Sequence, residues 1–269
     1  MNILIKVYDI ECYKRMFYAA FYNPLLKTWE KFEISERKND LYRLIKFLER
    51  DKNDNYYHVG FNNLNYDAQV LQYIYEQHGN WSHFTGDQLA LHIQKFSSRT
   101  IENSNYGLRP IYRNFYNKQI DLFKIHHFDN ESRRCSLKWL QYMMNWWNVE
   151  ETPHPFDSEI LTDEMKEDVI DYCHNDILST NRFLEFTVGE VNHSSYKGKN
   201  KIQDRLTIIE QGLLPEEAIN YSDSKIGDEF NKKAYCKLAN KSLQDLYNLR
   251  KNRGPTKKFT FGDAIPEHV

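Results

Sequence analysis

The sequence has none of the long apolar runs that identify membrane proteins. Its 269 residues include no stretch with the length and purity of a transmembrane span. The opening Met-Asn-Ile-Leu-Ile-Lys-Val also lacks the basic start and the small-residue cleavage site of a signal peptide. We therefore expect a soluble, cytoplasmic protein that has no membrane partner.

Paired cysteines and a large net charge are also missing. The four cysteines, Cys12, Cys135, Cys173 and Cys236, form no Cys-x-x-Cys pair, which argues against a zinc or disulfide framework. A formal charge of −2 gives no global basic signature, so nucleic-acid binding cannot be argued from charge alone. Residues 1–188 carry 22 basic and 27 acidic side chains, whereas residues 189–269 carry 14 and 11. This difference suggests two structural units.

The stretch around Asp9 and Glu11 is the strongest local feature. The apolar residues 3–7 predict a strand that runs into the two carboxylates. Successive side chains of a strand point to opposite faces, so Asp9 and Glu11 project from one face while Ile10 points into the core. Two anions this close suit a hard divalent ion such as Mg²⁺. The alternative is a pair of solvated acids at the end of a strand.

The next elements predict an α/β architecture with a mixed sheet. Residues 15–22 and 27–34 are expected to form strands, residues 40–50 an amphipathic helix, and residues 56–61 a short buried strand. Asp67 then falls near a helix N-terminus at the carboxyl end of that strand, where such folds place ligands, although Asp also occurs there as a simple cap. We expect residues 88–116 to form a β-hairpin insertion.

Two further elements complete the first part of the chain. A strand over 118–125 leads to a helix over 136–146, and a long helix follows over 162–188. Tyr172 and Asp176 are four residues apart on that last helix, so they share one face. On its own, this spacing also fits a packed tyrosine beside a solvated acid.

Together the three patterns resemble the exonuclease motifs of the DEDD family. Asp9-x-Glu11, Asn63-x-x-Tyr66-Asp67 and Tyr172-x-x-x-Asp176 occur in the order and contexts of the 3′→5′ proofreading exonuclease domain of family B DNA polymerases, in the subclass with tyrosine in the third motif. Ser136-Leu137 is similar to a segment that holds single-stranded DNA in the protein-primed phage members. The resemblance implies an RNase H-like three-layer fold with a central mixed sheet over residues 1–188.

The resemblance also implies the chemistry. Two divalent ions, Mg²⁺ or Mn²⁺, roughly 3.5–4 Å apart would activate water and stabilise the leaving oxygen of a phosphodiester. Asp9 would bridge them, Glu11 and Asp176 would bind the nucleophile-side ion, and Asp67 would bind the other ion mostly through water. Tyr172 would orient the attacking water together with Glu11. The products would be nucleoside 5′-monophosphates.

The same resemblance implies the partners. Asn62, Asn63, Tyr66, Ser136 and Leu137 would contact a single-stranded or frayed 3′ end of DNA, with Tyr66 stacking on a base. Residues 189–269 are expected to form a linker and a mainly helical extension that leads toward a polymerase palm. No palm motif follows in this sequence, so a chain carrying palm, fingers and thumb is a possible partner.

The predicted function is therefore proofreading exonuclease activity in DNA replication, in the host cytoplasm if the chain is phage-encoded. Two alternatives stay open. One is a free-standing DEDD nuclease that trims RNA. The other is a non-catalytic DNA-binding scaffold of a split polymerase, which would not need all four carboxylates.

Overall fold

The computed structural model describes residues 3–105 and 115–251. Its strands are β1 (Leu4–Tyr13), β2 (Met16–Asn23), β3 (Thr28–Ser35), β4 (Tyr56–Gly60) and β5 (Lys118–Asp121). Its helices are α1 (Leu41–Asn53), α2 (Asp67–Gln77), α3 (Gly86–Asn105), α4 (Leu122–Ile125), α5 (Leu137–Met143), α6 (Asp163–Thr187), α7 (Lys201–Glu210), α8 (Asp223–Ala239) and α9 (Leu243–Lys251). Most of the predicted elements are present within a few residues of their expected limits, but the strand predicted over 118–125 ends at Asp121, and Leu122–Ile125 form α4.

The strands form one mixed sheet in the order β3-β2-β1-β4-β5. β1, β2 and β3 make an antiparallel meander, whereas β4 pairs parallel to β1 and β5 parallel to β4. This order and these directions are those of the RNase H-like fold, so the predicted fold class is confirmed. The long β1 lies at the centre of the sheet, where it contacts strands on both sides.

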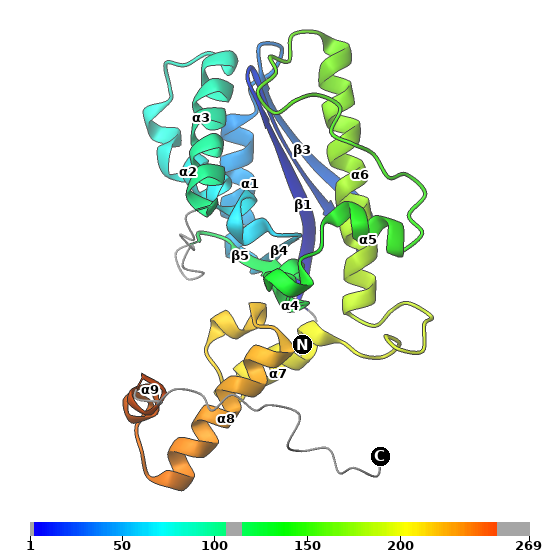
Figure 1. The fold of residues 1–269 in the computed structure, drawn as a ribbon. Coiled ribbons are helices and arrows are strands. Elements are labelled where there is room, and N and C mark those ends of the chain that lie inside the picture. The colour runs from blue at the N-terminus through cyan, green and yellow to red at the C-terminus, as the bar shows by residue number, and fades with distance from the viewer. Residues whose placement is uncertain (1–2, 106–114, 252–269) are drawn as a thin grey trace, which may run out of the picture. The chain divides into compact units, whose positions relative to one another are not determined.

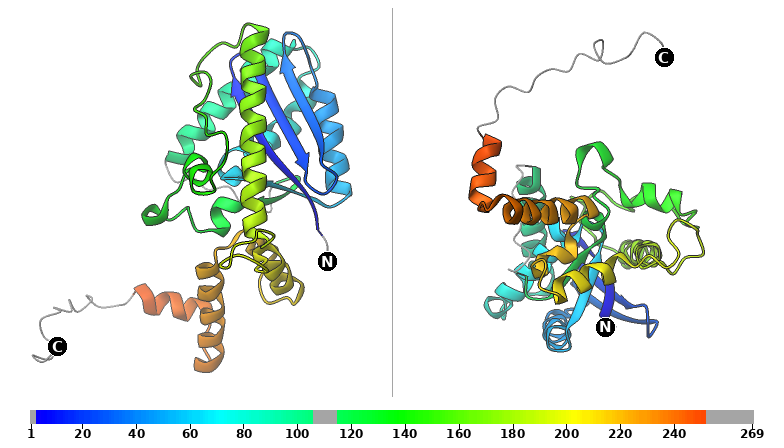
Figure 2. Two further views of the ribbon diagram at one scale, coloured as in Figure 1. Left: turned by 90° about the vertical axis from the view of Figure 1, so that its right-hand side faces the viewer. Right: turned by 90° about the horizontal axis from the view of Figure 1, so that it is seen from below.

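Helices cover both faces of the sheet and make three layers (Figure 1). One face packs on α1, α2 and α3, and Tyr8, Ile10 and Cys12 of β1 belong to that core. The other face packs on α6, which crosses the strands in Figure 2, and Val7 and Tyr13 of β1 belong to that second core. Because side chains alternate along a strand, Asp9 and Glu11 lie between Val7 and Tyr13 on the α6 side.

The long helix α6 begins where its sequence provides a cap. Thr162 accepts a hydrogen bond from the Met165 amide through its Oγ1 at 3.2 Å, and Asp163 and Glu164 place negative charge in the first turn, which the helix dipole favours. Its core face consists of residues spaced at helical intervals: Val169, Cys173, Ile177 and Leu184 are all buried. This packing fixes the rotation of α6 and so the direction of its functional side chains.

The predicted β-hairpin over residues 88–116 is wrong. Residues 86–105 form α3, and residues 106–114 lie outside the described part of the chain. Leu89, Ile93 and Phe96 follow a helical period and pack in the core with α1 and α2. Gly86 lets this helix start against the end of β3, since a Cβ there would lie 1.9 Å from the Ser35 carbonyl oxygen.

The chain divides into two compact units, Met1–Asp223 and Ser224–Val269. Residues 189–223 thus belong to the first unit, and Ile202, Leu206 and Ile219 contribute to its core. The second unit contains nearly all of α8 together with α9, and it exposes Leu238 by 88% and Leu249 by 54%. None of the helices in the described ranges combines the length and apolar character needed to cross a membrane.

Candidate active site

The site is built on the part of β1 that extends past its parallel neighbour. The pairing of β1 with β4 runs from Leu4 to Val7, whereas its pairing with β2 continues to Tyr13. Asp9 and Glu11 therefore lie where only β2 flanks the strand, opposite Ala20 and Tyr18. At this position other segments can approach the strand edge.

Asp67 reaches that edge from α2. After β4, the chain makes a short 3₁₀ turn over Asn63–Asn65, and Asp67 then opens α2. Its carboxylate accepts a hydrogen bond from the Ile10 amide and lies within hydrogen-bonding reach of the Asp9 side chain. The sequence prediction that Asp67 lies near a helix N-terminus is correct, and the structure brings it next to Asp9.

Tyr172 and Asp176 approach the same place from α6. The Tyr172 hydroxyl lies within hydrogen-bonding reach of Asp176, one turn further along the helix. Between them, Cys173 Sγ lies 3.7 Å from the carbonyl oxygen of Asp9, so this part of α6 rests directly on β1. The five residues predicted for catalysis thus come together from β1, α2 and α6.

The carboxylates of the site share one electrostatic environment. Burial raises the pKa of Asp9 and Glu11 well above the usual values, and the charges of neighbouring carboxylates raise both further. Burial also raises the pKa of Asp67 to about 7 and that of Asp176 to about 6. Since neighbouring acids are the main charges that act on Asp9 and Glu11, negative charge in this part of the site is poorly compensated.

Such a cluster fits a divalent cation chemically. Mg²⁺ and Mn²⁺ prefer carboxylate oxygens, and a bound cation would relieve the mutual repulsion that raises these pKa values. Among residues 3–105 and 115–251, however, no three His, Cys, Asp or Glu side chains are placed so that they could hold a metal ion as they stand. The charges of the four acids therefore affect one another, but their carboxylate oxygens do not surround a common metal position.

Gln141 on α5 is a site residue that the sequence analysis missed. Its side chain is fully buried, and its Nε2 donates hydrogen bonds to Asp176 Oδ1 and Ser179 Oγ, both at 2.8 Å. The Oε1 atom of the same amide has no hydrogen-bond partner. Since Gln141 and Asp176 are 35 residues apart, only the packing of α5 on α6 brings them together.

Asp121 is a second missed residue, and its role is structural. Its buried carboxylate accepts hydrogen bonds from the amides of Asn62, Leu64 and Phe123 at 2.9, 3.3 and 3.0 Å. Burial raises its pKa to about 6. Asp121 therefore fixes the loop that precedes Asp67.

Asn63 does not fit its predicted role as a DNA contact. Its side chain is fully buried, and its Nδ2 donates to Gln119 Oε1 at 2.9 Å and to the Tyr8 hydroxyl at 3.3 Å. These bonds join the loop to the sheet and leave the amide without solvent access. The sequence pattern located this loop correctly but could not distinguish an amide that points inward from one that points outward.

The other predicted DNA contacts lie at the surface or close to it. Ser136 is exposed and caps α5 by accepting a hydrogen bond from the Trp139 amide, while Leu137, Asn62 and Tyr66 are partly exposed. The Tyr66 hydroxyl lies 2.6 Å from Ser97 Oγ on α3, which holds its ring in place. Whether these four residues bind DNA stays a prediction.

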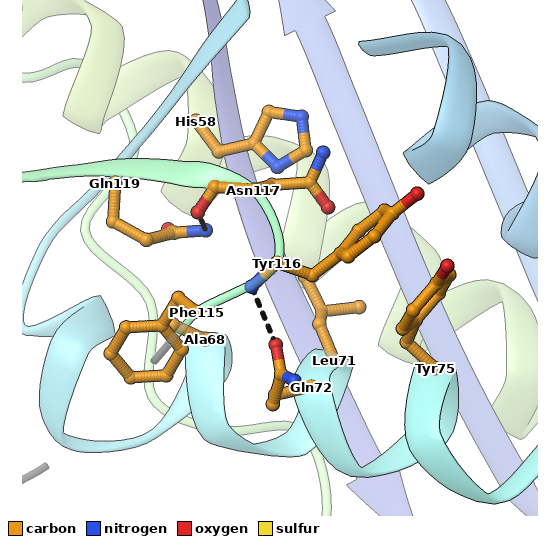
Figure 3. A pocket seen from close by; sticks show the side chains of 9 residues that line it. All are labelled: His58, Ala68, Leu71, Gln72, Tyr75, Phe115, Tyr116, Asn117 and Gln119. Atoms are coloured by element: carbon orange, nitrogen blue, oxygen red, sulfur yellow. Dashed lines mark hydrogen bonds between the residues drawn. The ribbon is translucent and has the colours of Figure 1, made fainter. Parts of the chain in front are cut away.

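A small cavity behind α2 is not part of the site. It measures about 10 Å³ and is lined by His58, Leu71, Tyr116 and neighbouring residues (Figure 3). The Tyr116 amide closes it by donating a hydrogen bond to Gln72 Oε1 at 2.7 Å. A cavity of this size holds about one water molecule, so it cannot take a substrate.

A distant structural likeness is found among known proteins. No protein-family model and no curated protein matches the chain. A solved structure of the family B DNA polymerase from the hyperthermophilic archaeon Pyrobaculum calidifontis is similar, with 16% sequence identity and a TM-score of 0.40. The likeness covers 70% of this chain and 25% of the polymerase chain. At this distance the likeness does not indicate the activity of this chain.

Proposed function

We propose that this chain is a metal-dependent 3′→5′ exonuclease that removes nucleotides from single-stranded or frayed DNA ends, as the proofreading part of a family B-type DNA polymerase. The observation that carries the proposal is the gathering of Asp9, Glu11, Asp67 and Asp176 around the free edge of β1. These four acids come from three separate elements, and burial and mutual repulsion raise the pKa of Asp9 and Glu11 well above the usual values.

Stability alone does not account for this arrangement. Burying uncompensated carboxylates destabilises a fold, and each group responds by raising its pKa. Acids that cluster together with perturbed pKa values are characteristic of catalytic sites. Tyr172 supports this interpretation, because burial raises the pKa of its hydroxyl and the nearby charges of Asp176, Glu11 and Asp9 raise it further.

Each residue has a distinct role in the proposed reaction. Asp9, Glu11, Asp67 and Asp176 would hold two Mg²⁺ or Mn²⁺ ions, which supply an activated water and stabilise the charge that develops on the phosphodiester. Tyr172 would donate or accept a hydrogen bond to position that water, while Gln141 keeps Asp176 oriented. Asp121 holds the loop before Asp67 so that α2 starts at the correct place.

The test is hydrolysis of a 3′-labelled single-stranded oligodeoxynucleotide in the presence of Mg²⁺. The wild-type chain should release labelled nucleoside 5′-monophosphate, and Asp9→Ala and Asp67→Ala should abolish the release. Both variants should melt at the wild-type temperature or above it, because each removes one charge from a repelling group. Full activity in either variant would refute the metal-ligand assignment.

Asp171→Ala is the matched control. Asp171 precedes Tyr172 on α6, but its side chain is exposed, so its removal should leave the rate unchanged. An RNA oligonucleotide of the same sequence separates the proposal from RNA trimming: faster release from RNA than from DNA would favour the ribonuclease. If the folded wild-type chain binds DNA but releases no nucleotide with either metal, the non-catalytic scaffold is supported instead.

A further inference from the structure

Three large aromatic side chains beside the candidate site are unusually exposed. Trp139 is exposed by 57%, Tyr142 by 67% and Trp147 by 76%. Aromatic rings normally bury most of their surface, so a group that stays exposed marks a surface for binding. We call Trp139, Tyr142 and Trp147 the aromatic segment.

Interior residues of the same stretch fix the aromatic segment to the part of α6 that carries Asp176. Gln141 donates to Asp176, and the Trp146 indole Nε1 donates to Asn175 Oδ1 at 2.9 Å. Asn175 in turn donates to the carbonyl oxygen of Asn148 at 3.0 Å. The exposed rings therefore alternate in sequence with residues that anchor the stretch next to the site.

The rings and charges of this stretch match one kind of ligand. Trp139 and Tyr142 lie with ring centroids 5.7 Å apart and planes 27° apart, so their faces are nearly parallel. Arg133 and Arg134 are exposed shortly before α5, whereas Lys138 forms an ion pair with Glu151. Flat rings stack on bases and basic side chains attract phosphates, and only a single strand leaves its base faces free for such contacts.

We propose that the aromatic segment is a stacking platform for the bases of the single strand that leads into the carboxylate site. This inference rests on the proposed exonuclease function and adds a substrate-binding surface to it. On this view α5 has two functional sides: Trp139 and Tyr142 bind the strand, and Gln141 orients Asp176. A protein partner on the same rings is the competing occupant.

Binding of a short fluorescein-labelled oligothymidine, followed by anisotropy in EDTA, tests the platform directly. Trp139→Ala and Tyr142→Ala should each weaken binding by about 5- to 150-fold, which corresponds to the loss of one base-stacking ring. Trp139→Phe should restore most of the affinity, since it keeps a ring. Tyr42→Ala is the matched control, because Tyr42 is exposed by 62% on α1, on the opposite face of the sheet, and should change binding less than twofold.

A second measurement separates this inference from the proposed function. Hydrolysis of p-nitrophenyl thymidine 5′-monophosphate needs the carboxylates but has no strand to stack on the rings. Its rate should be unchanged in Trp139→Ala and Tyr142→Ala, while the KM for an oligonucleotide rises. This unchanged rate would also show that the alanine variants keep Gln141 and Asp176 in place.

The outcomes are distinct. Wild-type binding that neither alanine variant weakens would overturn the platform and leave the exonuclease proposal intact, and the exposed rings would then be assigned to a protein partner. Equal loss of activity on the oligonucleotide and on the small ester would overturn it too, because the rings would then act on the carboxylates. Failure of the wild-type chain both to bind and to hydrolyse would refute the two proposals together.

Discussion

Replacing Gln141 by leucine tests whether the hydrogen bond to Asp176 matters for metal binding. Leucine has a similar volume and keeps the apolar contacts of α5, but it removes both donors of the amide. Partners that orient a metal ligand in this way change metal affinity or activity by about 10- to 100-fold when they are lost. We therefore expect Gln141→Leu to require about 10- to 100-fold more Mg²⁺ for half-maximal hydrolysis.

Stability should change much less than activity in this variant. The bond to the Asp176 carboxylate stabilises the fold by about 1.5–3 kcal/mol and the bond to Ser179 by about 1 kcal/mol, whereas the unpartnered Oε1 costs about 1–3 kcal/mol. The two hydrogen bonds outweigh the cost of the unpartnered oxygen by about 1 kcal/mol, so the melting temperature should fall by only a few degrees. A large loss of stability would mean that α5 had lost its packing.

Ser179→Ala is the control for Gln141→Leu. It removes one of the two acceptors of the amide and leaves the bond to Asp176. Its Mg²⁺ dependence should match that of the wild type when rates are measured on the same labelled oligonucleotide. If Gln141→Leu also keeps the wild-type Mg²⁺ dependence and rate, the amide does not position Asp176 and the reasoning fails.

Three further outcomes are expected. Tyr172→Phe should lower the turnover rate by about 10- to 10³-fold without changing the affinity for DNA, because only the positioning of water is lost; weaker DNA binding would make Tyr172 a substrate contact instead. His126 is partly buried beside Thr187, and burial lowers its pKa to about 4, so the unfolded chain takes up a proton first as the pH falls from about 6.5. The neutral His126 therefore contributes stability that is present above pH 6.5 and is lost toward pH 4, by at most about 2–3 kcal/mol. The melting temperature of His126→Gln should fall less between these pH values than that of the wild type. An equal fall would contradict the lowered pKa. Brief proteolysis should cut within α8 and α9 before it cuts the first unit, because Leu238 and Leu249 are exposed there; fragments that begin within the sheet would contradict this order.

The sequence was sufficient to predict the central strand and the residues that gather beside it. Alternation along β1 predicted that Asp9 and Glu11 share a face, and the spacing of Tyr172 and Asp176 predicted a shared helix face. Both patterns are local, with periods fixed by backbone geometry. The start of α6 could be predicted for the same reason, because Thr162 and the acids after it form a local N-cap signal.

What the sequence could not predict depends on contacts between distant residues. The burial of Asn63 follows from hydrogen bonds to Tyr8 and Gln119, which are 55 and 56 residues away. Gln141 stands out from other glutamines only because α5 packs against Asp176. The β-hairpin predicted in place of α3 is a different kind of error. The spacing of Leu89, Ile93 and Phe96 did indicate a helix, but the turn residues near Asn105 obscured that signal.

The hydrogen bonds between Asn220 and β5 have a consequence for how the protein is made. Asn220 accepts from the Asp121 amide at 2.7 Å and donates to the carbonyl oxygen of Gln119 at 3.0 Å, so a residue about a hundred positions later closes the outer edge of the sheet. Asp121 in turn holds the loop that leads to Asp67. Contacts of such long range form slowly and cannot form on the ribosome until residue 220 has emerged. The carboxylate cluster is thus expected to be among the last parts of the first unit to become ordered during synthesis. In a chain shortened to residues 1–188, which lacks Asn220, we expect the loop before Asp67 and the cluster to stay incompletely ordered.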